Sequence, residues 1–441
     1  TVLTSTLDAK DVEKLLEDLP NAGDVDSNSD LEEIEDLASE AMEAYEELSA
    51  EEQEKVDPDL VENLYELMEA LSAAQIMPVA ETGEIASLDD LKSAFEQGGE
   101  YSLSENITIG NAVDLVIEKD VTLVLNGHTI TKNYAAINHY FIVIKDGGSL
   151  TLNDSTGNGA LIAEAPFYGY GIQLRGDNPT FIMNGGKIQT SQESVDLYTY
   201  VSNAHVEVND GEIISTDDSA MSLRGSADVS IIGGTLTSGG RTGIYISGAG
   251  GNPEEKVSFN MSGGKLQHSG GMSGAIQAYK NTDISISGSA NIHSEDSYAI
   301  QAQENTALQI SGGTLSSESR SCTISVSDSA NCEITDGTIS NTRTGSAIKA
   351  EDDAVVSIKG GTLKSTRSSD LKEEDDAQIT VTGGTFANDV SDFVSGALIT
   401  KNDDGTYTVS QLETVYVAVD GDDAQNDGSE SKPFASLRKA L

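Results

Sequence analysis

Two adjacent acids, Asp217 and Asp218, stand in the polar stretch ahead of the apolar residues Met221 and Leu223. A pair of carboxylates can supply the general acid and the general base that cleave a glycosidic bond. The same pair also fits a solvated turn, because neighbouring stretches of the chain place acids or polar residues at the same point. Catalysis at this pair is one hypothesis, and an exposed turn is the other.

A column of acids recurs at intervals of 24, 24 and 23 residues: Glu304, Asp328, Asp352 and Asp375. If successive repeats stack, neighbouring carboxylates repel one another by about 1 kcal/mol even in water-like surroundings. A bound Ca²⁺ would relieve this repulsion and would find the hard oxygen ligands that it prefers. Alternatively, the side chains extend into solvent and salt screens their charges.

A second calcium candidate lies near the N-terminus. Acids or Asn occupy positions 1, 3, 5, 7 and 12 of a loop with the ligand spacing of an EF-hand: Asp24, Asp26, Asn28, Asp30 and Glu35. The loop departs from that pattern at position 6, where Ser29 replaces Gly. The alternative is an acidic loop between helices with Ser29 as an N-cap. We expect that no cofactor is required, and Ca²⁺ is the candidate ion.

Aromatic rings on a surface are the side chains that would stack on sugars. They occur ahead of Gly171, again one repeat later, and further along the chain: Phe167, Tyr168, Tyr170, Tyr198, Tyr200, Tyr245 and Tyr279. If the repeats stack, these rings lie along one face and form a glycan-binding surface. They fit packing or loop positions equally well.

These residues can meet only if a repeating fold positions them. Gly-Gly, Asp-Gly or Gly-Ser pairs mark turns about every 24 residues, from Gly185-Gly186 to Gly383-Gly384. One longer step contains the insertion 248–256 and leaves the next repeat in phase, as a surface loop on a solenoid does. Apolar and polar residues alternate on both sides of each turn, which predicts strands.

Short strands repeated at a fixed period cannot bury their apolar faces alone, so the coils must stack and align like residues. The fold class is therefore all-β, a right-handed parallel β-helix with coils of about 24 residues, preceded by a small acidic α-helical domain. Three inward-facing ladders are predicted: Leu308, Cys332, Val356 and Ile379; Ile310, Ile334, Ile358 and Val381; and Ile300, Ile324 and Ile348.

The chain divides into three predicted parts. Residues 1–77 form an acidic helical bundle or spacer, in which apolar residues recur at helical spacing, as at Ile34, Leu37, Ala41 and Leu48. Residues 78–411 form the β-helix, and a capping helix over 88–97, with Ser87 as its N-cap, covers the first coil. Residues 412–441 are the truncated start of a further β-helix-type module.

The formal net charge of −49 argues against nucleic acid and anionic membranes as partners, because both would repel the chain. No apolar run approaches 18 residues, so we expect no membrane insertion. Cys322 and Cys332 are expected to be free thiols rather than a disulfide. The histidines have no metal-ligand spacing and are expected at surface or turn positions: His128, His139, His205, His268 and His293.

The motifs at 121–130, 148–152 and 402–409, with the Gly-Gly-Thr-Leu repeats, resemble modular surface proteins of Gram-positive, often gut-dwelling, bacteria. Those proteins carry pectate-lyase-like β-helix domains, and the resemblance covers residues 80–410. It implies a secreted, wall-attached protein with a role in adhesion or glycan binding. Polygalacturonase-like enzymes of this fold carry Gly-His-Gly and Arg-Ile-Lys motifs, and this sequence has neither.

We therefore expect an extracellular, non-catalytic and monomeric module that binds or presents a glycan, or binds a host surface. The alternative is a carbohydrate-active enzyme, either a polysaccharide lyase or a glycoside hydrolase, or an ancillary domain of one. The fold alone does not separate these functions, because many activities share it.

Overall fold

The computed structural model of the chain describes residues in two compact units, Thr1–Glu81 and Thr82–Leu441. The described residues are 9–17, 19–20, 34, 37–38, 41–42, 44–45, 48, 53, 55–58, 60–61, 63–67, 82–110, 115–133, 140–163, 169–249, 255–270, 273–411, 416–425 and 432–436.

The N-terminal unit is helical. It contains α1 (Ala9–Glu17) and further helical residues between 34 and 67, which bury an apolar cluster: Ala9, Val12, Leu16, Leu19, Ala38, Ala41, Ala44, Leu48, Val56, Leu64 and Leu67. The prediction that Leu37 lies on the apolar face of its helix is wrong, since this side chain is 42% exposed. The buried face instead passes through Ala38 and Ala41, which are three residues apart and so share one side of a helix.

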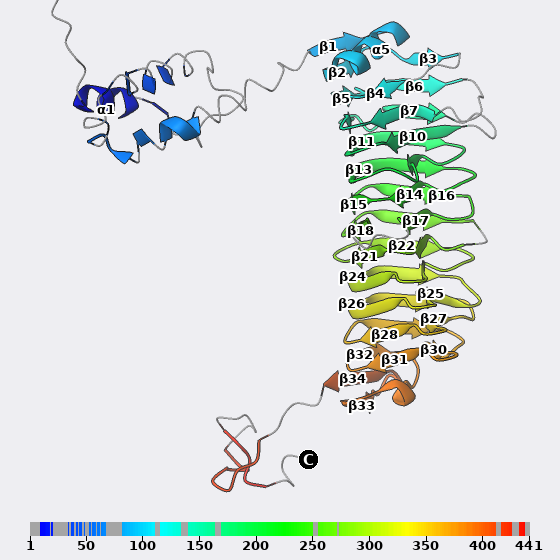
Figure 1. The fold of residues 1–441 in the computed structure, drawn as a ribbon. Helices are drawn as coiled ribbons and strands as arrows, with labels where there is room; N and C mark the ends of the chain where they lie inside the picture. Colours follow the sequence, from blue (N-terminus) through cyan, green and yellow to red (C-terminus); the bar gives the residue numbers. More distant parts are fainter. Residues whose placement is uncertain are drawn as a thin grey trace, which may run out of the picture. The chain divides into compact units, whose positions relative to one another are not determined.

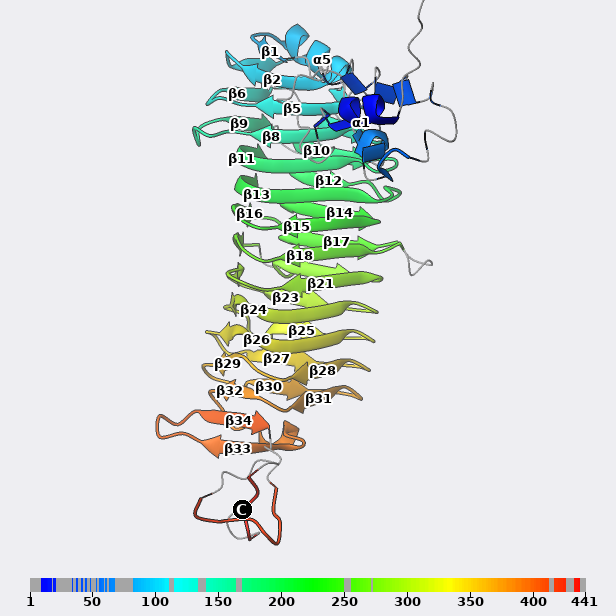
Figure 2. The same ribbon diagram turned by 90° about the vertical axis from the view of Figure 1, so that its left-hand side faces the viewer.

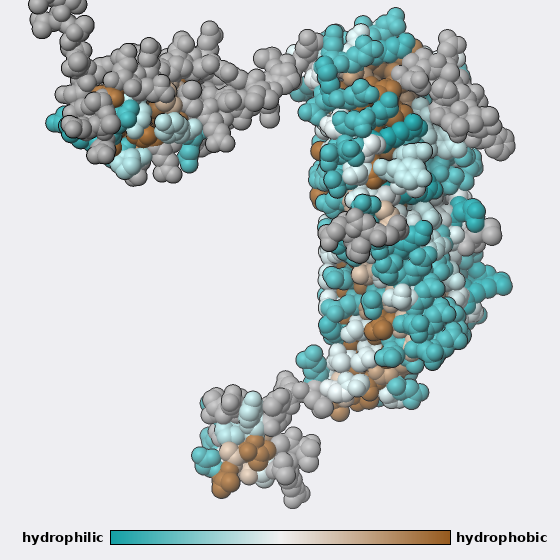
Figure 3. Space-filling model, in the orientation of Figure 1, coloured by the Kyte–Doolittle hydropathy of each residue, from teal (hydrophilic) through white to brown (hydrophobic). Residues whose placement is uncertain are grey.

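The second unit is a parallel β-solenoid of about 11 turns with about 24 residues per coil, as the repeat predicts. Its coils stack along one axis (Figures 1 and 2). Each complete coil contributes strands to three faces. No helix in the described part of the chain is long and apolar enough to cross a membrane, and hydrophilic residues cover most of the solenoid surface visible in Figure 3.

The strands of each face follow one another in chain order. Face 1 is an 11-stranded sheet: β4 (Val116–Ile117), β7 (Tyr140–Lys145), β10 (Tyr170–Arg175), β12 (Val195–Leu197), β14 (Met221–Gly225), β17 (Ile244–Gly248), β20 (Ile276–Tyr279), β23 (Ile300–Ala302), β25 (Cys322–Val326), β27 (Ser346–Ala350) and β30 (Leu371–Glu373). Face 2 contains β1 (Thr82–Ile85), β2 (Gly99–Leu103), β5 (Asp120–Val124), β8 (Ser149–Asn153), β15 (Ala227–Ile231), β18 (Val257–Met261), β21 (Thr282–Ile286), β28 (Val355–Ile358) and β31 (Gln378–Val381). Face 3 contains β3 (Ile107–Ile109), β6 (Thr129–Lys132), β9 (Ala160–Ala163), β16 (Thr235–Ser238), β19 (Lys265–His268), β22 (Asn291–Ser294), β29 (Thr362–Ser365) and β32 (Gly384–Phe386). Long strands run through both of these faces: β11 (Thr180–Thr190), β13 (Ala204–Ser215), β24 (Ala307–Ser317) and β26 (Asn331–Asn341).

The three predicted ladders are confirmed by the strand register. Leu308 pairs with Cys332, and Cys332 pairs with Val356 in the next coil. The other two ladders align in the same way through Ile310 and its equivalents and through Ile300 and its equivalents. Every member is buried, and burying such a side chain contributes about 1.5–3 kcal/mol.

Both cysteines lie inside the solenoid as free thiols, as predicted. Cys332 belongs to an inward ladder, and Cys322 pairs with Ser346 on face 1. Burial raises the pKa of each thiol to about 12. A thiol with so high a pKa is a weak nucleophile near neutral pH, so neither cysteine is suited to covalent chemistry.

The corner between face 2 and face 3, here called the glycine corner, carries the repeated glycine pairs. At Gly337 the backbone has φ +110°, a conformation that L side chains rarely adopt. A Cβ at this residue would also lie 2.8 Å from the carbonyl oxygen of Gly312 in the preceding coil. Glycine is therefore required both by the turn and by the close approach of the neighbouring coil.

The two ends of the stack are covered. At the first coil lies α5 (Leu88–Gln97), whose Leu91 and Phe95 join the core; its N-cap is Ser87, as predicted, with Oγ accepting from the Asp90 N–H. At the last coil, η2 (Ser391–Phe393) precedes a hairpin of β33 (Ala397–Lys401) and β34 (Tyr407–Gln411). Because β34 pairs antiparallel with β32, the parallel stack ends there. Further on, Val417 and Phe434 form an isolated bridge.

We expect Gly337→Ala to lower the free energy of unfolding by about 2 kcal/mol or more, because the backbone there has a φ that L side chains rarely adopt and the new Cβ meets the backbone of the preceding coil. Gly110→Ala is the matched control, since Gly110 is exposed and a Cβ there meets no described residue within 4 Å. Urea denaturation followed by circular dichroism measures both variants. Equal midpoints for the two would contradict this account of the corner.

Candidate functional site

A cavity of about 200 Å³ opens where face 1 meets the corner that links face 3 to face 1, here called the third corner. Residues far apart in sequence line it because successive coils bring them together. They supply carboxylates, guanidinium groups, hydroxyls, a phenol ring and an amide: Glu193, Asp218, Ser219, Ser222, Arg224, Arg241, Thr242, Tyr245, Ser273 and Gln277.

Buried serines at the ends of the face 3 strands fix the shape of the third corner. The Ser215 Oγ donates to the carbonyl oxygen of Gln192 at 2.8 Å and accepts from the Asp218 N–H at 3.1 Å. In the next coil, the Ser238 Oγ lies 2.8 Å from the carbonyl oxygen of Asp218. These bonds join one corner to the next, so the backbones that carry Glu193 and Asp218 have a defined separation.

His268 occupies the same column, since it pairs with Ser238. Its predicted surface or turn position is wrong, because the side chain is 1% exposed and faces inward at the end of β19. Burial lowers the pKa of its imidazole. The Nε2 atom lies 3.1 Å from the carbonyl oxygen of Ser273, so this ring helps to shape the cavity wall.

A buried carboxylate, Asp196 on β12, lies beside the cavity on face 1. It accepts hydrogen bonds from the Tyr140 hydroxyl at 2.8 Å, the Gln173 amide at 2.6 Å and the Arg224 guanidinium at 3.3 Å. A buried charge requires such partners. Burial, with the charge of Asp196 adding to it, raises the pKa of Tyr140, which keeps this hydroxyl a donor.

Arg224 is thereby held in a defined position. While one side of its guanidinium bonds to Asp196, its central carbon lies 5.2 Å from the centroid of the Tyr245 ring, within the range of a cation–π contact. Tyr245 in turn lies 5.8 Å from Tyr279. The cavity therefore has one aromatic ring, Tyr245, and the positive charge of Arg224 on its face 1 side, with Tyr279 beside Tyr245 but outside the lining.

Glu193 has an environment unlike that of Asp196. Burial raises the pKa of its carboxyl to about 7, the charges of Asp218 and Asp196 act in the same direction, and Arg224 opposes them. Its Oε2 atom is buried and has no hydrogen-bond partner among the described residues. Near neutral pH this side chain is partly protonated, so the cavity contains an acid able to donate a proton.

Of the two predicted catalytic acids only one lines the cavity, and the predicted glycan-binding rings that the structure describes lie along face 1. Asp218 lines the cavity, whereas Asp217 is exposed outside it. The described aromatic rings lie on or beside face 1: Tyr170, Tyr198, Tyr200, Tyr245 and Tyr279. Phe167 and Tyr168 lie outside the described residues.

The part of face 1 around β7, β10 and β12 carries a second cluster of aromatic side chains. The Tyr140 and Tyr170 rings lie 4.9 Å apart, and the guanidinium carbon of Arg175 lies 5.8 Å from Tyr140 and 5.4 Å from Tyr198. Tyr200 is 80% exposed and lies 5.9 Å from Tyr198. Exposed rings beside a guanidinium extend the surface available to a ligand beyond the cavity.

Several residues of the site were missed by the sequence reasoning: Glu193, Asp196, Arg224, Arg241, Tyr140 and Gln277. A signal for some of them was present in the register of face 1. Outward positions in adjacent strands place Gln173, Asp196 and Ser222 one above another, with Tyr245 and Gln277 following. Aligning the outward columns as carefully as the inward ladders would have found this polar run.

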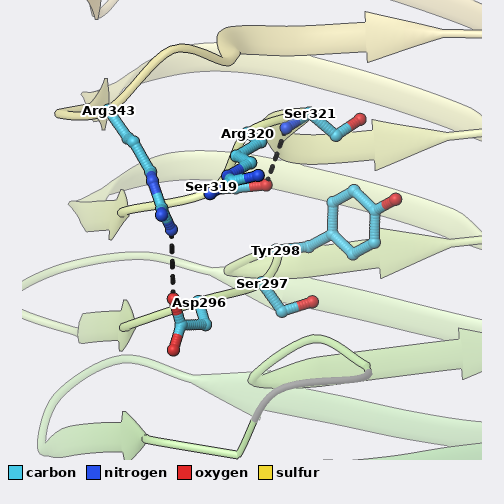
Figure 4. A pocket seen from close by; sticks show the side chains of 7 residues that line it. All are labelled: Asp296, Ser297, Tyr298, Ser319, Arg320, Ser321 and Arg343. Atoms are coloured by element: carbon cyan, nitrogen blue, oxygen red, sulfur yellow. Dashed lines mark hydrogen bonds and ion pairs between the residues drawn. The ribbon is translucent and has the colours of Figure 1, made fainter.

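A second and larger cavity, of about 460 Å³, lies further along the same corner. Figure 4 shows side chains from successive coils around it. Arg343 reaches Asp296 with an Nη1–Oδ1 distance of 3.1 Å, while Tyr298 and Arg320 also line the opening. Its position on the same edge means that a ligand lying along the solenoid axis can contact both cavities.

The predicted acidic column lies at the corner between face 1 and face 2. Each of Glu304, Asp328, Asp352 and Asp375 has a positive φ, between 54° and 58°. The Glu304 N–H donates to the Asp328 carboxylate at 3.2 Å, and the Asp328 N–H donates to the Asp352 carboxylate at 3.1 Å. Asp328 and Asp352 thus bind the backbone of the preceding coil, and Asp tolerates the left-handed conformation better than most residues.

Neighbouring lysines form ion pairs with other acids at this corner between face 1 and face 2. Lys349 contacts Glu351 at 2.5 Å and Glu374 at 2.7 Å, and the hydrogen bonds from Lys349 and Lys372 lower the pKa of Glu374 to about 2. Within the described ranges no group of His, Cys, Asp and Glu is arranged to hold a metal ion. Calcium binding by the column stays a prediction, and the loop residues Asp24, Asp26, Asn28, Asp30 and Glu35 lie outside the described residues.

Comparison with known proteins adds no assignment. The chain matches no family model, no curated protein and no solved structure. Function must therefore be argued from the geometry of the site.

We expect Asp328→Asn and Asp328→Ala to differ in stability. The Asn variant keeps the left-handed turn and an acceptor while removing one like charge, so it should unfold at a urea midpoint equal to or above that of the wild type in low salt. The Ala variant should lose about 1–2 kcal/mol. Denaturation in 10 mM and 500 mM NaCl tests this, and equal losses in both variants would argue against a structural role for the carboxylate.

The raised pKa of Glu193 predicts a pH dependence of stability. An unfolded Glu releases its proton near pH 4.3, whereas folded Glu193 keeps it until about pH 7. Between these values the folded state binds more protons, so stability falls as pH rises. We expect the free energy of unfolding of the wild type to fall by on the order of 2 kcal/mol between pH 4.5 and 7.5 because of Glu193, and we expect Glu193→Gln to abolish this fall. Urea denaturation across this range measures it, with the exposed Glu295→Gln as control; curves that stay parallel for wild type and Glu193→Gln would refute the assignment.

Proposed function

We propose that this chain is an extracellular, cell-surface β-helix module that binds a neutral glycan along the edge formed by the third corner and face 1. The observation that carries the proposal is the cavity that combines Tyr245 with Arg224 and Gln277. Wall attachment in a Gram-positive bacterium and a monomeric state are part of the proposal and rest on the resemblance of the repeats.

The chemistry of the cavity wall suits a sugar ring. Tyr245 in the cavity wall offers aromatic surface to the apolar face of a sugar, and Tyr279 lies beside Tyr245 outside the lining. Arg224, Thr242 and Gln277 offer donors and acceptors to its hydroxyl groups. Pockets that combine a few positioned polar groups with aromatic surface are typical of small-molecule recognition.

The arrangement of the cavities favours a chain over a single sugar. Arg241 in the first cavity and Arg320 in the second are three coils apart, or about 14 Å at about 4.8 Å per coil. Solenoids generate extended binding surfaces of this kind because each coil repeats the preceding one. A polysaccharide lying parallel to the axis would contact both cavities at once.

The net charge favours a neutral glycan. At −49 the chain repels polyanions over the range of the Debye length, which disfavours highly sulfated chains and nucleic acid. Glu193 and Asp218 add local negative charge in the cavity itself.

Binding is tested by presenting the purified chain on an array to xylan and mannan, and to pectin and mucin O-glycans as charged comparisons, with titration of each one retained; retention of the charged chains alone would contradict a neutral ligand. We expect Tyr245→Ala to weaken binding about tenfold, because it removes one stacking surface. Tyr416→Ala removes a ring that is 40% exposed but distant in sequence from both cavities, and should leave affinity unchanged. Retention of no glycan, or equal affinities of the two variants, would contradict the proposal.

A further inference from the structure

We propose that the cavity at the third corner hydrolyses a glycosidic bond of the glycan that it binds, with Glu193 as the general acid and Asp218 as the general base. This inference rests on the proposed glycan binding. It replaces the expectation of a non-catalytic module with an activity assigned to named side chains.

The geometry distinguishes these two acids from the others nearby. Glu193 and Asp218 come from consecutive coils and line the same small cavity. The Oε2 atom of Glu193 is buried and has no hydrogen-bond partner within the described part of the chain, so no protein donor holds this carboxyl in its ionised form at that oxygen. Asp196 is unsuited to either role, because Tyr140, Gln173 and Arg224 already occupy its oxygens.

Asp218 is suited to activating water. Its Oδ1 accepts the Ser219 N–H at 2.9 Å, which orients the carboxylate. The Ser215 hydroxyl fixes its backbone through the bond to the Asp218 N–H. The side chain remains half-buried, so that solvent reaches it at the cavity mouth.

The environments of the two acids differ as the two roles require. Burial, aided by the charges of Asp218 and Asp196, raises the pKa of Glu193, while Arg224 on face 1 opposes them. Arg241 is the other charged group on the cavity wall, and Tyr140 stays neutral as a donor to Asp196. Glu193 therefore carries a proton near neutral pH and can give it to a leaving oxygen.

The reaction is a single displacement by water. Glu193 transfers its proton to the glycosidic oxygen as the bond from that oxygen to the anomeric carbon breaks. The oxygen of a water molecule bonds to the anomeric carbon, and Asp218 takes a proton from that water. The products are a new reducing end and a free hydroxyl. Glu193 regains a proton from solvent and Asp218 releases one, so the step needs no oxidant, reductant or cofactor.

The experiment uses the whole chain and each polysaccharide that the array retains, and it measures new reducing ends. We expect turnover by the wild type, with losses of at least about 100-fold in Glu193→Gln and in Asp218→Asn. Asp217→Asn is the matched control, because its carboxylate is adjacent in sequence but exposed outside the cavity, and it should keep wild-type activity. The wild-type rate should fall as pH rises above about 7, when Glu193 loses its proton.

The outcomes separate this inference from the proposed binding. Glycan retention without new reducing ends would overturn hydrolysis and leave glycan binding intact. Absence of retention would overturn the binding on which hydrolysis rests. Unsaturated uronate absorbance in place of plain reducing ends would indicate a lyase and would also overturn it. Retained glycan binding by Glu193→Gln and Asp218→Asn shows that these variants are folded, so an unchanged rate in either would refute its assigned role.

Discussion

Backbone hydrogen bonds between successive coils hold equivalent residues about 4.8 Å apart along the solenoid, and the rest of the structure depends on this register. Leu308, Cys332 and Val356 become neighbours only because their strands pair in parallel and in register at these positions, the shifts between β24 and β26 occurring further along, at the glycine corner. Every side chain on a coil therefore has a near-equivalent above and below it. A residue that suits its position must suit the whole column, which explains why glycine recurs at the glycine corner.

The same register that stacks apolar residues also stacks charges, and the protein accommodates them in different ways. At the corner between face 1 and face 2, Asp328 and Asp352 accept backbone N–H groups from the preceding coil. Lys349 contacts two acids from successive coils. Asp196, which is buried, has three donors. The Oε2 atom of Glu193 has no donor among the described residues, and burial outweighs the opposing charge of Arg224, so the pKa of this carboxyl is raised.

The third corner connects the core to the proposed chemistry. Inside it, the small hydroxyl side chains of Ser215 and Ser238 bind the corner backbone and leave no room for solvent. Outside it, the backbone so held presents Glu193 and Asp218 to one cavity. Because rigid elements position catalytic groups better than loose loops do, a stacked corner is a suitable place for an acid and a base. The open edge beside it gives a polymer room to extend.

The repeat of about 24 residues is visible without the fold, and it predicts the strands, the inward ladders and the glycine corner, while the N-cap serine and the apolar spacing predict the helix that covers the first coil. These features follow from local patterns: alternation of apolar residues, paired glycines and an N-cap serine. Folding, in contrast, places Asp218 in a cavity while Asp217 stays exposed, buries His268, and brings Glu193 and Arg224 to the same cavity wall. The repeat does not predict these outcomes, because burial and pKa depend on neighbours contributed by other coils, and the direction of a corner side chain depends on hydrogen bonds that no sequence period records.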